Sequence, residues 1–148
     1  MDTGVYRIID ANLNRVMEGV RVCEDIMRFA SNNERLTSRL KGLRHELFLA
    51  IKDIRREHLE EMVSSRDVND VGGKTIESEK VRGDITELFM ANAQRGKESL
   101  RVLEEVLKLF DGDLSQKFKK FRYKLYEIEK TAVEDLSVTE RLIGNRGK

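Results

Sequence analysis

Apolar residues recur along most of this chain at the three- and four-residue intervals of an α-helix. The pattern predicts four main helices, over about 3–30, 36–62, 84–110 and 114–132. A short fifth helix is expected after Ser137, with a frayed tail over Gly144–Lys148. Because no segment alternates apolar and polar residues as a strand does, we expect an all-α four-helix bundle forming one domain over residues 1–148.

Polar residues mark the ends of these segments. Asp2 or Thr3 is expected to cap the first helix and Asp84 the third. Turns are expected at Ser31–Asn33 and Asp111–Asp113. The connection over residues 64–83 is long for a helical bundle, and loops of that length are usually functional or disordered.

Composition narrows the class of protein further. The chain has 148 residues, no proline, one cysteine and a formal charge of +1. One cysteine excludes a disulfide scaffold, and two histidines do not provide a zinc site. The charge balance gives no reason to expect nucleic acid, and the basic run Lys117–Lys124 is interpreted as a solvated helix face. With no membrane span and no export leader in view, we expect a cytoplasmic protein.

The chain contains a sequence repeat. Shifting it by 80 residues aligns residues 11–27 with 91–107, and seven of the seventeen positions are identical. At an offset of 78, the second apolar segment aligns with the fourth, and Arg44 falls on Arg122. The sequence therefore predicts two helical hairpins related by a pseudo-twofold axis, over about 5–63 and 84–136.

The repeated positions are polar as well as apolar. A helical wheel places Arg15 and Arg95 within apolar stripes, where an unpaired charge is costly. One interpretation is structural: Arg15 pairs with Glu98, and Arg95 with Glu18. The other is an anion pocket, since the guanidinium group suits phosphate oxygens. The pocket would be lined by Asn12, Arg15, Asn92, Arg95, Arg44 and Arg122.

The central loop and one histidine add further candidates. Gly73–Thr75 resembles the end of a P-loop, but valine stands at position 68, where that motif needs glycine. The loop is either a flexible linker or a site, with Lys74 for phosphate and Asp67 and Asp70 for a metal ion. His45, which follows Arg44, is either a structural histidine or a member of the site.

Several motifs together resemble one known family. They are Arg7-Ile8-Ile9-Asp10-Ala11-Asn12, continuing through Arg15, Glu18 and Glu24; Leu43-Arg44-His45; Arg66-Asp67-x-x-Asp70-Val71-Gly72; and Asn92-x-x-Arg95-x-x-Glu98-x-x-Arg101. The sequence is similar to the monofunctional hydroxymethylpyrimidine-phosphate kinase family, a helical domain found alone or fused to thiamine-phosphate synthase.

That resemblance implies an activity. The protein would transfer the γ-phosphoryl group of ATP, with Mg²⁺, to hydroxymethylpyrimidine monophosphate and form the diphosphate. Arginines and a metal ion could support such a transfer without a covalent nucleophile.

The roles expected under this resemblance extend over both halves and the loop. Arg15, Arg95, Arg44 and Arg122 would clamp phosphates. Substrate would be bound by Asn12, Asn92, Glu18, Glu98 and His45. The nucleotide would be bound by Arg66, Asp67, Asp70, Gly72 and Lys74, with Asp67 and Asp70 holding Mg²⁺.

An alternative function stays open beside the kinase. The chain could be a non-catalytic helical module that binds a thiamine-pathway enzyme such as thiamine-phosphate synthase. The apolar seams of the second and fourth helices could also support a homodimer. Differences between the halves, such as Gly19 against Ser99 and Met17 against Lys97, favour one asymmetric site over two equivalent ones.

Overall fold

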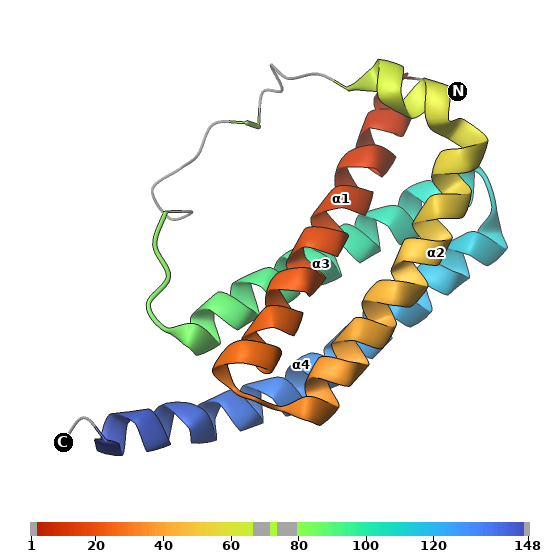
Figure 1. Cartoon of the computed structure of the whole chain (residues 1–148). Coiled ribbons are helices and arrows are strands. Elements are labelled where there is room, and N and C mark those ends of the chain that lie inside the picture. Colours follow the sequence, from red (N-terminus) through yellow and green to blue (C-terminus); the bar gives the residue numbers. More distant parts are fainter. Residues whose placement is uncertain (1–2, 67–71, 74–79, 147–148) are drawn as a thin grey trace.

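The computed structural model describes residues 3–66, 72–73 and 80–146, which form an all-α fold. Its helices are α1 (Thr3–Asp25), α2 (Glu34–Ser65), α3 (Ile85–Val106) and α4 (Gly112–Arg146), as Figure 1 shows. A π-helical segment, Ile26–Ala30, follows α1, and a 3₁₀ turn, Leu107–Leu109, follows α3. No strand occurs in these ranges, so the predicted all-α class is confirmed.

Asparagine and aspartate side chains start three of the helices. Asn33 caps α2 by accepting a hydrogen bond from the backbone N–H three residues later, at 2.9 Å. Asp84 caps α3 in the same way at 2.7 Å, which confirms its predicted role. Asp111 accepts from the third following N–H at 3.2 Å and starts α4. Thr3 is the first helical residue of α1, and Asp2 lies outside the described residues.

The predicted short fifth helix is wrong, because α4 runs unbroken from Gly112 to Arg146. Ser137 resembles a helix cap in the sequence, but its hydroxyl donates to the carbonyl oxygen of Val133 at 2.9 Å. That bond lets a serine lie inside a helix. Buried Leu136 keeps this part of α4 on the core. The frayed tail expected from Gly144 is also wrong as far as Arg146, while residues 147–148 lie outside the described range.

Two other helix ends differ from the sequence prediction. The α-helical part of α3 stops at Val106, and the 3₁₀ turn completes the segment that was expected to reach Phe110. In α2, His58 has non-helical dihedral angles (φ −128°, ψ 26°) and marks a kink. The helix nevertheless continues past Met62 to Ser65, which carries its C-terminus back toward the start of α1 (Figure 1).

Helices α1 and α3 cross at the centre of the bundle, while α2 packs on α1 and α4 packs on α3. The crossing is close because Gly19 has no side chain: a Cβ atom there would lie 2.8 Å from the carbonyl oxygen of Asn92. The predicted apolar seams of the outer helices are buried. They comprise Leu36, Leu40, Leu43, Leu47, Ala50 and Ile54 on α2, and Phe118, Phe121, Leu125, Ile128 and Ala132 on α4. Leu114, the first residue of the predicted α4 seam, is partly buried against the same core.

The expected burial of Arg15 and Arg95 is wrong, since both side chains are exposed. Because α1 and α3 cross rather than run parallel, each covers only part of its partner's stripe. Gly19 is buried near the crossing, whereas Ile8 and Arg15, nearer the start of α1, face solvent. Among the described helices, none is long and apolar enough to span a membrane.

Candidate functional site

An open cleft of about 710 Å³ lies beside the first half of α1, where the end of α2 approaches it. Three arginines and one aspartate are among its lining residues, so its described charge is positive. The lining consists of Gly4, Arg7, Ile8, Asp10, Ala11, Asn12, Asn14, Arg15, Ser65 and Arg66. We call this the arginine cleft.

Asp10 lies at the inner wall of the arginine cleft, with its side chain only 7% exposed. Its carboxylate accepts two hydrogen bonds from Arg66, from Nε at 3.0 Å and from Nη2 at 3.2 Å. The guanidinium of Arg55, on α2, lies 3.7 Å from the same carboxylate. One buried acid on α1 therefore binds two arginines from α2 and its C-cap.

These contacts hold the guanidinium groups of Arg66 and Arg55 beside Asp10. The pKa of Arg66 is raised above its ordinary value, mainly by its hydrogen bond to Asp10 and then by the carboxylate's charge. Arg55 also donates from Nη2 to Oδ1 of Asn14 at 2.5 Å. Its Nε atom is buried and has no hydrogen-bond partner in the part of the chain that the structure describes.

The two predicted substrate-binding asparagines have matching local contacts. Nδ2 of Asn12 donates to the carbonyl oxygen of Ile8 at 2.8 Å, and Nδ2 of Asn92 donates to that of Leu88 at 2.9 Å. Each asparagine side chain is therefore oriented by the backbone carbonyl group four residues earlier in its own helix. Asn12 lines the arginine cleft together with Arg15, whereas Asn92 is not among its described lining residues and has its carbonyl oxygen against Gly19 at the α1–α3 crossing.

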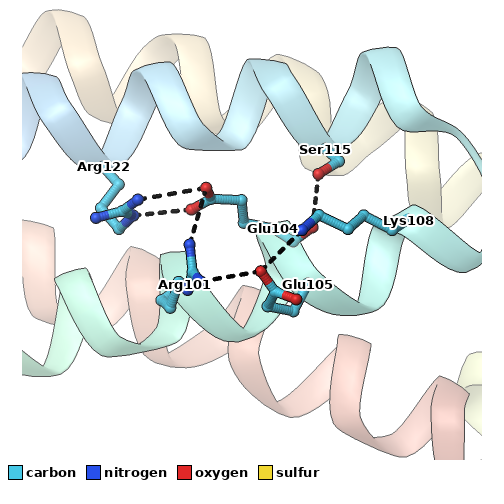
Figure 2. Close-up of polar contacts among 6 residues, drawn as sticks. All are labelled: Arg101, Glu104, Glu105, Lys108, Ser115 and Arg122. Atoms are coloured by element: carbon cyan, nitrogen blue, oxygen red, sulfur yellow. Dashed lines mark hydrogen bonds and ion pairs between the residues drawn. The ribbon is translucent and has the colours of Figure 1, made fainter.

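Arg44 and Arg122, expected to clamp phosphates, bind glutamates instead. Arg122 donates to Glu104 from Nε at 2.8 Å and from Nη2 at 3.3 Å, while Arg101 approaches the same carboxylate (Figure 2). Arg44 donates to Glu24 in the same two-pronged way, at 3.1 and 3.3 Å. Each pair joins the two helices of one half.

The distance between Arg44 and the arginine cleft follows from the length of α1. Glu24, its partner, is nine residues beyond Arg15 on α1, which corresponds to about 14 Å of helix. Arg44 and Arg122 are therefore placed to join helices and not to line the cleft.

Other predicted site residues are dispersed. His45 is exposed on α2, and Glu18 and Glu98 are exposed on α1 and α3. Glu98 accepts a hydrogen bond from Gln94 at 3.0 Å, and the alternative pairing of Arg15 with Glu98 is not among the described ion pairs. Of the predicted site residues that the structure describes, it brings together Asn12, Arg15 and Arg66 at this cleft.

The predicted loop ligands are only partly described. Gly72 is exposed in a turn, and Asp67, Asp70 and Lys74 lie outside the described residues. Within the described ranges, no group of three or more histidine, cysteine, aspartate or glutamate side chains could hold a metal ion. The predicted Mg²⁺ ligands Asp67 and Asp70 therefore stay a prediction.

The sequence pattern did not identify two lining residues of this site, Asp10 and Asn14, nor Arg55, which contacts both of them. Asp10 belongs to the family motif, but the sequence pattern assigns it no role, and Asn14 aligns with Gln94 and not with an identical residue at the offset of 80. Arg55 belongs to a run of charged residues on α2 that resembles an ordinary solvated face. The signal that could have identified Asp10 is a carboxylate next to Ile9 on the apolar side of the helix.

The arrangement can bind an anion. Guanidinium groups that are already oriented by carboxylates and amides lose less freedom when a phosphate binds. Arg66 uses two of its five N–H groups on Asp10 and keeps three for another acceptor. Exposed Arg7 and Arg15 lie on the same cleft and add positive charge.

Fold and cleft together define a small all-α domain with a basic, open cleft beside α1. A sequence profile described as the ThiD2 family matches residues 7–131. The chain therefore belongs to the ThiD2 family.

Curated relatives of this chain are named thiamine-phosphate synthase. Those from Nostoc punctiforme and Synechocystis sp. are 39% and 40% identical over 127 and 129 residues, which is 84% and 86% of this chain. The relative from Rhodopirellula baltica is 40% identical over 124 residues. The chain spans about a third of the length of these relatives, between 32% and 36%. No solved structure matches the sequence.

These comparisons correct the functional prediction. The sequence motifs favoured an ATP-dependent phosphomethylpyrimidine kinase, whereas the relatives carry the name thiamine-phosphate synthase. The assignments as kinase, ATP-dependent enzyme and ATP-binding phosphotransferase are therefore contradicted. The thiamine pathway is supported, and so is the alternative in which the helical domain accompanies thiamine-phosphate synthase.

Proposed function

We propose that this chain is a non-catalytic helical module that binds thiamine-phosphate synthase. One observation carries the proposal: about 85% of the chain aligns with thiamine-phosphate synthases, but it accounts for only about a third of each of them. A domain that occurs within a larger synthase is expected to contact the remainder of that protein. When the two are separate chains, the same contact would form between molecules.

We also propose that the arginine cleft binds a phosphate-bearing small molecule of this pathway. Its support is the set of oriented arginines around Asp10 and the exposed Arg15 on the same wall. The name of the relatives denotes an enzyme whose product is a phosphate ester, so phosphate ligands are present wherever the module works. Pyrimidine phosphate, ATP and Mg²⁺ are ligands to test at this cleft, and no phosphoryl transfer is proposed.

We further propose that the two halves are repeats of one helical hairpin. The support is a pair of matching contacts. Glu24–Arg44 and Glu104–Arg122 have the same atoms in the same two-pronged arrangement. The repeat would explain why an asparagine and an arginine–glutamate pair occur at the same place in each half.

Sedimentation velocity tests the synthase partnership. The purified chain is mixed with thiamine-phosphate synthase from the same organism, and each protein is also run alone. The proposal predicts a complex that sediments faster than either component, while the chain alone forms no thiamine phosphate. Two species that sediment independently at every concentration would overturn it. The run on the chain alone also tests the proposed homodimer.

A further inference from the structure

We propose that Asp10 is the positioning residue of the anion site, and that it confines the site to one half of the protein. The proposal deepens the proposed function and depends on its arginine cleft. It starts from the charge of Asp10: a buried carboxylate beside an anion site should repel the ligand. Such a residue helps binding only if it improves the geometry of the arginines by more than its charge costs.

The geometry gives Asp10 that role. Arg66 is the C-cap of α2 and its side chain is half exposed, so its helix alone does not fix the guanidinium. Two hydrogen bonds to Asp10 fix both the position and the plane of the group. The Nη1 edge of Arg66 and one hydrogen of Nη2 remain for a phosphate oxygen.

Arg55 is positioned from the same side. Its guanidinium lies between two side chains of α1. Nη2 of Arg55 donates a hydrogen bond to Asn14, and the same nitrogen lies 3.7 Å from the carboxylate of Asp10. Asp10 and Asn14 are one helical turn apart on α1, so one face of α1 orients two cations that come from α2. Arg66 lines the cleft, so ordering its long side chain before the ligand arrives reduces the entropy that binding loses, while Arg55 adds a second positive charge beside Asp10.

The second half has a cleft at the corresponding place, but the charge of its described lining is negative and not positive. At an offset of 80, Asp10 corresponds to Met90, Arg7 to Glu87 and Asn14 to Gln94; Met90, Glu87 and Gln94 all line that second cleft. At the offset of 78 that relates α2 to α4, Arg55 corresponds to Val133. The second half therefore lacks both the positioning carboxylate and one of its arginines.

Acidic residues dominate this second cleft. Its described lining contains four acids and no arginine or lysine: Asp84, Glu87, Glu129 and Glu140. One of them, Glu129, pairs with buried Lys97 at 2.6 Å. The chain therefore binds one phosphate-class anion, on the α1–α2 side, and the equivalent place on α3–α4 repels it.

Isothermal titration with inorganic pyrophosphate tests the proposal, because two explanations predict opposite signs for Asp10→Asn. If Asp10 contributed only charge, its removal would tighten binding. The positioning role predicts binding weakened by about tenfold or more, with one anion per wild-type chain, since a hydrogen bond between charged groups contributes that much. Asp25→Asn, which removes an acid from the same helix away from the cleft, should change the affinity less than twofold.

A second variant guards against loss of fold in Asp10→Asn. Arg66→Lys keeps the charge on a half-exposed side chain but cannot form the two-pronged bond to Asp10. The proposal predicts weaker pyrophosphate binding by this variant, with an unchanged circular dichroism spectrum. Wild-type affinity in a folded Asp10→Asn or Arg66→Lys variant, or two equal sites per chain, would overturn it.

Failure of this inference is distinguishable from failure of the synthase partnership. If Asp10→Asn binds pyrophosphate as tightly as the wild type, co-sedimentation of the chain with the synthase is unaffected. Conversely, a chain that does not bind the synthase can still bind pyrophosphate. A wild-type chain that binds no pyrophosphate would overturn both the anion site and the positioning role of Asp10.

Discussion

Arg122 on α4 forms a two-pronged ion pair with Glu104 on α3, and Glu104 is nearly inaccessible to solvent, with 4% of its side chain exposed (Figure 2). Its counterpart in the first half is the pair Glu24–Arg44. Two such pairs at matching positions fix the register of each pair of packed helices. The presence of both pairs therefore has a structural explanation that needs no ligand.

Glu104→Gln is expected to destabilise the protein. It leaves Arg122 without its charged partner in a nearly buried place, which lowers the free energy of unfolding by about 3 kcal/mol. Urea denaturation followed by circular dichroism measures the change. The matched control is Glu105→Gln, a change at the neighbouring exposed glutamate, which pairs with Lys108 at the surface and should alter stability little. Equal stability of the two variants would contradict a structural role for Glu104.

Two glycines should respond in opposite directions to alanine. Gly19→Ala places a Cβ 2.8 Å from the Asn92 carbonyl oxygen and must push α1 from α3, lowering the unfolding free energy by about 1–3 kcal/mol. Gly42→Ala, in α2, meets nothing within 4 Å and should raise it by about 0.5–1 kcal/mol. Thermal melts of both variants measure the difference. A Gly19→Ala variant as stable as Gly42→Ala would contradict the close crossing.

Cys23 should be unreactive in the native protein. Burial, and after it the charge of the Glu129 carboxylate, raises the pKa of its thiol to about 12. Since the thiol loses its proton only near that pH, almost no thiolate is present at pH 8. Labelling with a thiol reagent should therefore be slow in buffer and fast in urea. Fast labelling of the folded chain would contradict the burial of Cys23.

The sequence was informative about helices and seams because periodicity reports local structure. Leu40, Leu43 and Leu47 fall on one side of α2 at steps of three and four, and all are buried. Asp84 lies just before a segment with helically spaced apolar residues, and it caps α3 as expected. Ser137 failed as a boundary signal because a serine can bond either to following N–H groups or to a preceding carbonyl.

The site was less predictable because it depends on contacts between distant segments. Asp10 and Arg66 are 56 residues apart, and they meet only because α2 continues past its kink to Ser65. Arg15 fell within an apolar stripe on the helical wheel, but the crossing angle of α1 and α3 decides which part of that stripe is covered. The hydrophobic pattern of one helix carries no information about the angle at which it crosses another.

The most direct test of the account compares Arg15→Ala with Arg95→Ala. These arginines align with each other when the sequence is shifted by 80 residues and both are exposed, but of the two only Arg15 is among the described lining residues of the arginine cleft. Isothermal titration with hydroxymethylpyrimidine monophosphate measures the dissociation constant of each variant against that of the wild type. The account predicts about tenfold or weaker binding for Arg15→Ala, from the loss of one charge-assisted contact, and less than a twofold change for Arg95→Ala. Equal losses in both variants, or none in Arg15→Ala, would contradict a single anion site in the arginine cleft.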